Sequence, residues 1–207
     1  MIAYYYIMGR YVPKEIFMKI RPYDKKDFRY VQDVCMATSK YAQDDTPSNR
    51  AILTTMYCDY YLDNQPDYCF VAVDDNDLPI GYVLCVVDLD EYQERMQQEY
   101  LPLVRKVSSG DYFHFIAETK VAERYVRQGY TAHMHVNVLE EYQRQGLGTQ
   151  LVTALENKLK EMFVEGAYLI CGQKNAVARA FYEKLGYEDI DYLAGAVVYG
   201  KKFFTED

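Results

Sequence analysis

Hydrophobic residues follow two spacings along this chain, and each spacing predicts a kind of element. Alternating or continuous apolar stretches are typical of strands. They occur at residues 17–21, 69–73, 80–87, 133–139, 167–171 and 197–204. Apolar residues three or four positions apart are typical of helices. They occur in segments that begin near Phe28, Ser48, Asp90, Leu147 and Asn175. This order predicts a mixed central sheet with helices on both faces, in the α/β (α+β) class.

Turn and cap residues set the boundaries of several elements. The polar stretch 40–47 ends in proline and predicts a loop, with Ser48 as the N-cap of the next helix. Residues 74–77 (DDND) predict a hairpin turn. The charged helical pattern at 90–107 is interrupted at Pro102. A short strand is expected at Tyr112–Ile116.

Length and composition describe one globular domain. The 207 residues are 50% hydrophobic and 26% charged, which is enough to bury a full core without a metal or a disulfide. Met18-Lys19-Ile20 looks like the natural start of that domain. We therefore read residues 1–17 as an N-terminal extension and residues 18–207 as a single domain.

Charge and cysteine content narrow the function classes. The chain has 23 Lys and Arg against 31 Asp and Glu, a net charge of −8, which argues against a nucleic-acid partner. No apolar run approaches the roughly 18 residues of a membrane span. The five cysteines form no CxxC pair, which disfavours a disulfide framework and a metal site. With no signal-peptide pattern at the N-terminus, the expected location is cytoplasmic.

The most informative segment is the loop Gln143–Thr149 (QRQGLGT), which lies between a predicted strand and a predicted helix. Gly146 and Gly148 allow the backbone to turn tightly. The amides of residues 144–149 can then face one concavity at a helix N-terminus, where an anion such as a pyrophosphate is favoured. The loop lacks the GK[ST] of a P-loop and the third glycine of the dinucleotide fingerprint. Taken alone, it fits a simple helix start equally well.

A second motif follows the next buried strand. Residues 175–187 read NAVARAFYEKLGY. Together with QRQGLG at 143–148, this sequence resembles the GNAT (Gcn5-related N-acetyltransferase) family from about Met18 to the C-terminus. The segments EYLPLVRK (99–106) and YTAHMHVNVLEEYQRQGLG (130–148) further resemble the subgroup related to the acetyltransferase-like domain found beside O-GlcNAc hydrolases. That subgroup tends to carry an acidic residue where this chain has Asn137.

The resemblance implies the GNAT fold and an N-acetyltransferase that uses acetyl-CoA as co-substrate and no metal. It implies that a primary amine attacks the thioester directly. A bulge would separate the two central parallel strands, and the amide of Val138 or Leu139 would polarise the thioester carbonyl. The residues expected to bind acetyl-CoA are Val136, Val138, Leu139, Gln143, Arg144, Gln145, Gly146, Leu147, Gly148, Thr149, Asn175, Ala178, Phe181 and Tyr182.

Two side chains are the expected catalysts. Tyr182 resembles the family's general acid, which protonates the CoA thiolate, although a packed core tyrosine is an equal reading. His133, His135 and Asn137 alternate on one strand face. His133 is the candidate general base, because it lies nearest the strand position from which several GNAT enzymes recruit a carboxylate. An ordered water chain or a carboxylate from elsewhere are the alternatives. Asn175 also suits an N-cap.

The expected partner is a small-molecule or protein amine, and the acidic net charge favours a cationic one. No nucleic acid and no membrane is expected as partner, and the resemblance allows a homodimer. The alternative function is a non-catalytic CoA-binding or interaction module on the same fold.

Overall fold

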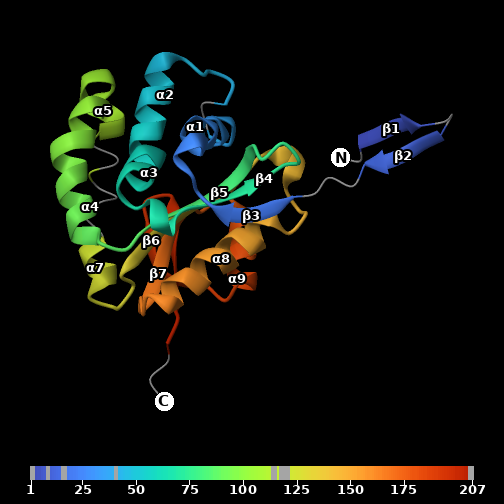
Figure 1. Cartoon of the computed structure of the whole chain (residues 1–207). Coiled ribbons are helices and arrows are strands. Elements are labelled where there is room, and N and C mark those ends of the chain that lie inside the picture. Colours follow the sequence, from blue (N-terminus) through green and yellow to red (C-terminus); the bar gives the residue numbers. More distant parts are fainter. Residues whose placement is uncertain are drawn as a thin grey trace.

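A computed structural model describes residues 3–7, 10–14, 18–39, 42–112, 116 and 122–204, the first two ranges as backbone. Its main feature is a seven-stranded sheet in the order β3–β4–β5–β6–β7–β9–β8 (Figure 1). The strands are β3 (Lys19–Pro22), β4 (Phe70–Val73), β5 (Pro79–Val86), β6 (Ala132–Val138), β7 (Gly166–Gly172), β8 (Glu188–Leu193) and β9 (Ala196–Lys202). Neighbouring strands are antiparallel except β6 and β7, which are parallel. The predicted mixed sheet is confirmed.

Helices cover both faces of this sheet (Figure 1). The helices on one side are α1 (Phe28–Ala37), α2 (Pro47–Thr54), α3 (Tyr60–Asn64), α4 (Leu89–Arg95), α5 (Leu101–Val107) and α7 (Ala122–Val126). Two π-helical turns, η2 (Thr55–Asp59) and η4 (Met96–Tyr100), join α2 to α3 and α4 to α5. The opposite side carries α8 (Leu147–Glu161) and α9 (Ala176–Lys184). The described ranges also hold three short 3-10 turns: η1 (Lys25–Asp27), η3 (Pro66–Tyr68) and η5 (Glu140–Tyr142).

The sheet separates two hydrophobic clusters. The cluster under α1 to α7 includes the fully buried Tyr61 and Tyr82. The cluster under α8 and α9 includes Met134, Leu151 and Tyr182. Because side chains alternate along each strand, the central strands contribute to both clusters, and a residue's place in the sequence decides which side of the sheet it faces.

The spacing of leucines explains how α8 lies on the sheet. Leu147, Leu151, Leu155 and Leu159 are all buried, at 2% exposure or less. Residues four apart share one helix face, so this face packs on the sheet and holds the helix N-terminus at the end of β6. The predicted end of this helix at about Glu161 is confirmed.

Two prolines lie at helix starts. The helix predicted from Ser48 begins earlier: Thr46 is its N-cap, with Oγ1 accepting a hydrogen bond from the Asn49 N–H at 3.2 Å, and Pro47 occupies the first turn. Proline is favoured there because that position needs no N–H donor. In the same way Pro102 lies in the first turn of α5, after the π-helical turn.

Two further predictions about elements need correction. Tyr112 and Ile116 are helical, so they do not belong to the short strand predicted there; residues 113–115 lie outside the described residues. Strand β8 was not predicted, because Glu188, Asp189 and Asp191 interrupt its apolar pattern. It is the edge strand of the sheet, where charged side chains reach water.

The N-terminal strands β1 (Ala3–Ile7) and β2 (Arg10–Lys14) form a separate two-stranded antiparallel sheet. Figure 1 shows this hairpin away from the seven-stranded sheet. The first strand of the large sheet, predicted at 17–21, begins at Lys19, and Phe17 lies outside the described residues.

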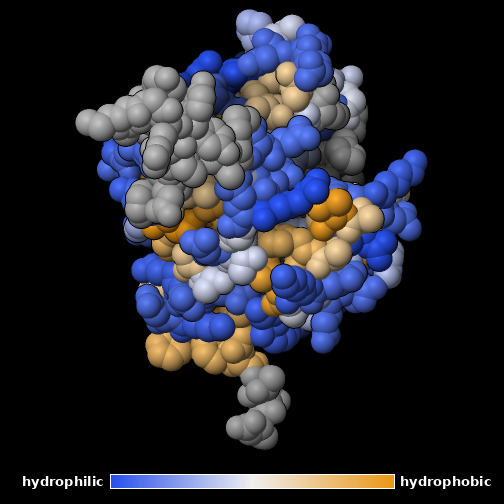
Figure 2. All heavy atoms as spheres, turned by 90° about the vertical axis from the view of Figure 1, so that its right-hand side faces the viewer, coloured by the Kyte–Doolittle hydropathy of each residue, from blue (hydrophilic) through white to orange (hydrophobic). Residues whose placement is uncertain are grey.

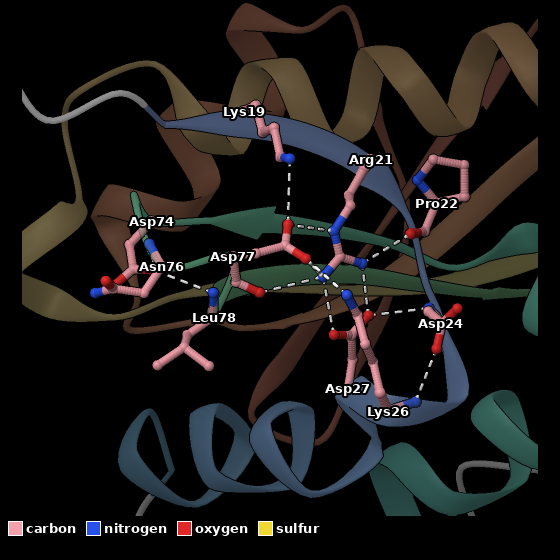
Figure 3. A network of polar contacts seen from close by, with 10 residues as sticks. All are labelled: Lys19, Arg21, Pro22, Asp24, Lys26, Asp27, Asp74, Asn76, Asp77 and Leu78. Carbon is pink, nitrogen blue, oxygen red and sulfur yellow. Dashed lines mark hydrogen bonds and ion pairs between the residues drawn. The ribbon is translucent and has the colours of Figure 1, made fainter.

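An ion-pair network ties the edge strand β3 to the rest of the domain (Figure 3). The Arg21 guanidinium contacts Asp27 at 2.6 Å and Asp77 at 2.9 Å, joining β3, η1 and the β4–β5 turn. Lys19 and Lys26 also pair with Asp77. Figure 2 shows the side of the molecule that carries this edge: hydrophilic residues cover most of it, with smaller hydrophobic patches between them.

Candidate active site

The two parallel strands at the centre of the sheet pair over a short distance only. Their register joins Ala132 to Ala167 and His133 to Tyr168, although both strands continue beyond these residues. On its other edge β6 pairs with β5 along nearly its whole length. The second half of β6 therefore lacks a ladder partner on the β7 side, as the family resemblance implied. The β5–β6 register runs without a shift from His133 to Val138, so the expected bulge is not present in that pairing.

Backbone directions along β6 show which amides face this opening. The Leu139 N–H donates to the Ile80 carbonyl of β5 at 2.9 Å. Backbone groups of successive strand residues point to opposite edges, so Val136 and Val138 turn theirs toward β7. The Val138 carbonyl accepts a hydrogen bond from Gln143 Nε2 at 2.8 Å. Of the two amides expected to polarise a carbonyl, the N–H of Val138 faces the opening and that of Leu139 is engaged by β5.

The glycine loop has the geometry of an anion site. Arg144 and Gly146 both have left-handed backbones, with φ of 58° and 84°. Such turns direct successive N–H groups into one concavity. Gly146 is the N-cap of α8, no side chain caps the helix, and no acidic residue lies in its first turn. The first N–H groups of the 15-residue helix therefore face outward with a partial positive charge.

The second glycine of the loop has a packing role. A Cβ on Gly148 would lie 3.2 Å from Phe181 Cζ, so the absence of a side chain lets α8 approach α9. At the start of α9, Asn175 is the N-cap, and its Oδ1 accepts the Ala178 N–H at 3.1 Å. The N-cap interpretation of Asn175 thus holds, and the start of α8 lies against α9 at Phe181.

Tyr182 is buried on the α9 side of the sheet, at 8% exposure. Its ring packs against those of Phe181, Tyr187 and Tyr199, with centroids 5.1 to 6.2 Å apart. Burial, and to a lesser degree nearby Cys171 of β7, raises the pKa of Tyr182. The hydroxyl therefore stays protonated at neutral pH and keeps a proton to donate.

A cavity of about 360 Å³ lies on the other face of β6. Its walls come from α1, α2, η2, β5, β6 and the segment after α5. The lining residues are Cys35, Thr38, Ser39, Ile52, Leu53, Met56, Tyr57, Tyr82, Asp111, His135 and Asn137. They are far apart in the sequence, and the fold alone brings them together.

Of the two histidines on β6, His135 lines this cavity. Its ring meets the edge of Tyr57 with centroids 5.3 Å apart. The Nε2 atom is buried and has no hydrogen-bond partner among the described residues. Burial lowers the pKa of His135 to about 4, so the imidazole is neutral at pH 7.

His133, the base expected from the sequence, lies two residues before His135 on the same face of β6. Its Nδ1 is 3.1 Å from the Tyr61 hydroxyl, and its ring stacks on Tyr168 at 4.7 Å. Burial and the neighbouring His135 lower the pKa of His133 well below its ordinary value. It is absent from the described cavity lining, but its ring centroid is 4.7 Å from that of His135.

Two polar residues that line the cavity, Asn137 and Tyr82, are hydrogen-bonded to each other, and the sequence analysis identified only the first. Asn137 Nδ2 donates to the Tyr82 hydroxyl at 2.8 Å, and both residues line the cavity. Asn137 attracted notice on the predicted strand face, but Tyr82 did not. The available signal was a phenol within the otherwise apolar run 80–87. At the rim, Asp111 accepts a hydrogen bond from the Ser108 hydroxyl at 2.7 Å.

No group of three or more histidine, cysteine or acidic side chains is placed to hold a metal ion in the described part of the chain. Likewise, no helix of the described residues is both long and apolar enough to cross a bilayer.

Comparison with known proteins agrees with this geometry. A family model described as the acetyltransferase (GNAT) family matches residues 34–187. The match spans the cavity, the glycine loop and the Asn175–Tyr187 motif.

Solved structures share the fold. The crystal structure of SsHAT has a TM-score of 0.76 at 24% identity, covering 89% of this chain and 98% of that one. A polyamine N-acetyltransferase of Drosophila melanogaster, which forms N-acetylagmatine, has a TM-score of 0.62 at 15% identity over 90% and 100% of the two chains. An agmatine N-acetyltransferase has a TM-score of 0.61 at 15% identity over 90% and 99%.

Proposed function

The chain belongs to the acetyltransferase (GNAT) family, and from that premise we propose that it transfers an acetyl group from acetyl-CoA to a primary amine bound in the cavity beside β6. One observation carries the proposal. The cavity lies against one face of β6, and α8 with its glycine loop lies on the other face. Between them β6 stops pairing with β7. A thioester held at this opening would be accessible to an amine in the cavity.

The residues present fit acetyl-CoA. The uncapped start of α8 and the left-handed residues Arg144 and Gly146 suit a pyrophosphate. The backbone of Val136 and Val138 suits the amides of a pantetheine arm, because such an arm can pair with a strand edge. The bound acetyl-CoA would supply an activated acetyl thioester. The Val138 N–H is the donor in this proposal that stabilises the oxygen of its carbonyl as negative charge develops there.

On the acceptor side, His135 is the group that takes the proton of the attacking nitrogen. Its neutral imidazole and unpartnered Nε2 support this role. The nitrogen becomes acidic once its bond to the carbonyl carbon has formed, so a weak base is sufficient at that moment. His133, which we expected from the sequence as base, takes the position behind it and orients the His135 ring through their contact.

Tyr182 supplies the proton that the departing CoA sulfur needs. Its protonated hydroxyl and its place on the α9 side, near Cys171 of β7, support this role. In this proposal the amine arrives from one face of the sheet and the sulfur leaves toward the other, so acid and base never compete for one position.

The proposal also includes the location of the protein, its oligomeric state and its subgroup within the family. A cytoplasmic location is supported by five buried cysteines that form no disulfide with one another. A homodimer, and the likeness to the subgroup found beside O-GlcNAc hydrolases, stay predictions from the sequence.

The loop can be tested with one matched pair of variants. Thr149 is exposed in the first turn of α8. A Thr149→Glu change places a negative charge where the pyrophosphate would bind, while an acidic residue there favours the helix itself. Thr149→Gln is the neutral control. We expect calorimetry to show acetyl-CoA binding to the wild type, weakened about tenfold or more by the Glu variant and little by the Gln variant, with NADH and ATP as ligand controls.

The amine reaction is then followed by release of the CoA thiol. Release with a primary amine supports the transferase. Binding of acetyl-CoA without release to any amine would favour the alternative, a non-catalytic CoA-binding module. Equal binding by both Thr149 variants would remove the loop from the proposal.

A further inference from the structure

We infer that the acceptor of this enzyme is a monoamine with an apolar body, selected by Ile52, Leu53 and Met56. This inference rests on the proposed function, since it names the class of amine that the same cavity takes. It differs from agmatine and the polyamines for which two of the structural neighbours are named, since those molecules carry more than one cationic group.

The chemistry of the cavity wall is the first argument. Ile52 and Leu53 from α2 and Met56 from η2 line it side by side. The π-helical turn at 55–59 adds an extra residue to the helix, and such turns are frequent at functional sites. The adjoining Tyr57 presents an aromatic ring that contacts His135. The side chains of Ile52, Leu53 and Met56 offer a ligand dispersion contacts and no hydrogen bond. Thr38 and Ser39, which also line the cavity from the end of α1, donate their hydroxyls to the Val34 and Met36 carbonyls.

The position of the polar groups is the second argument. Asn137, Tyr82 and His135 lie on the strands β5 and β6, beside the opening where the thioester would be. The acceptor's nitrogen is thus directed to the strand side and its body to the helical wall. Pockets of this kind use a few polar groups to orient a ligand and apolar area to hold it.

Charge is the third argument. In the described part of the chain one carboxylate, Asp111, lines the cavity, and no lysine or arginine does. Asp111 already accepts the Ser108 hydroxyl. With His135 neutral, a single ammonium group is attracted toward the cavity. A second ammonium at the far end of the same molecule would lie against Ile52, Leu53 and Met56, none of which carries a charge to balance it, and this desolvation is costly.

A homologous series of amines tests the inference. We expect kcat/KM to rise from propylamine through hexylamine, by up to about fourfold for each methylene buried against the wall. The decisive comparison is hexylamine with the diamine in which its terminal methyl is replaced by an amino group. The two have equal length, and we expect kcat/KM for the diamine to be lower than that for hexylamine by a factor of about ten or more.

A pair of variants tests the residues. Leu53→Asp places a carboxylate in the wall, and Leu53→Asn is its neutral control of equal size. We expect the diamine-to-hexylamine ratio of kcat/KM to be about tenfold higher in the Asp variant than in the Asn variant. Thermal unfolding and acetyl-CoA binding show whether both variants fold. If either does not fold, the wild-type series decides.

The outcomes separate this inference from the function on which it rests. A flat series, or a diamine that matches or exceeds hexylamine while CoA is released, would overturn the inference and leave the transferase intact. If no amine releases CoA, the proposed function fails. The affinities of hexylamine and of its matched diamine, measured by calorimetry, then decide the preference of the cavity. Equal or tighter binding of the diamine would overturn the inference.

Discussion

Asn137 donates a hydrogen bond to the Tyr82 hydroxyl over 2.8 Å, across the β5–β6 pair and in the lining of the cavity beside β6. The two residues are directly opposed in the register. Tyr82 is fully buried, so the bond is shielded from water and holds the Asn137 amide in one orientation. Its other polar atom, Oδ1, is then available to an incoming amine.

The first prediction follows from this pair. Tyr82→Phe removes the hydroxyl and frees the amide to rotate, so we expect KM for the amine to rise about threefold to tenfold, equivalent to about 1 kcal/mol. Binding of acetyl-CoA should not change. Tyr60→Phe is the matched control, because the buried Tyr60 hydroxyl has no hydrogen-bond partner in the described residues. A rise in KM of equal size in both variants would contradict a specific role for Tyr82.

The second prediction concerns Tyr182. Tyr182→Phe keeps the ring that packs on Tyr187 and Tyr199 and removes the proton donor. We expect kcat to fall about a hundredfold or more while calorimetric binding of acetyl-CoA is kept. If kcat with a given amine is unchanged, Tyr182 is a packing residue and the leaving sulfur takes its proton elsewhere.

A third prediction distinguishes the two histidines. His135 lines the cavity and His133 contacts Tyr61 beneath it. We expect His135→Gln to lower kcat/KM about a hundredfold, and His133→Gln to lower it by about tenfold or less, since general-base catalysis contributes at least the larger factor. Steady-state kinetics with one amine at several pH values make this measurement. The reverse order of effects would restore His133 as the base.

The low pKa of His135 also predicts a pH dependence of stability. Its pKa is about 4 in the folded protein against 6.5 ordinarily, so the unfolded chain binds a proton more readily. Stability is therefore fully present above pH 6.5 and is lost as the pH falls toward 4. We expect denaturant unfolding of His135→Gln to show a smaller loss over this interval than the wild type. If the variant loses as much stability over this interval as the wild type, other groups cause the loss, His133 first among them.

The ion pairs at β3 give a prediction at lower pH. Lys26 and then Arg21 hold the pKa of Asp77 below its ordinary value of 3.8. The contribution of Asp77 is present above that value and is lost as the pH falls below it. Asp77→Asn should remove this part of the acid dependence. Asparagine also tolerates the left-handed backbone at this position, where φ is 61°. The difference in urea unfolding between wild type and variant therefore reports the loss of the carboxylate charge and not backbone strain. Parallel stability curves from neutral to acid pH would contradict the assignment.

The expectations that held were those with a local cause. The glycine loop and the helix after it are adjacent in sequence, and Gly146 has the left-handed backbone that glycine permits. The leucines of α8 lie four apart and face the sheet together. The predictions that failed concern segments whose position in the tertiary structure outweighed their local sequence pattern. Strand β8 is acidic because it lies at the edge of the sheet.

The sequence by itself determined most of the elements and their order, the loop at the start of α8 and the motif at the start of α9. Each depends on hydrogen bonds between residues a few positions apart. Which histidine reaches the cavity, that Tyr82 meets Asn137, and where β6 leaves β7 were decided by the tertiary structure alone. These features arise from the packing of α1, α2 and η2 on strands far away in the chain, and no local spacing encodes such contacts.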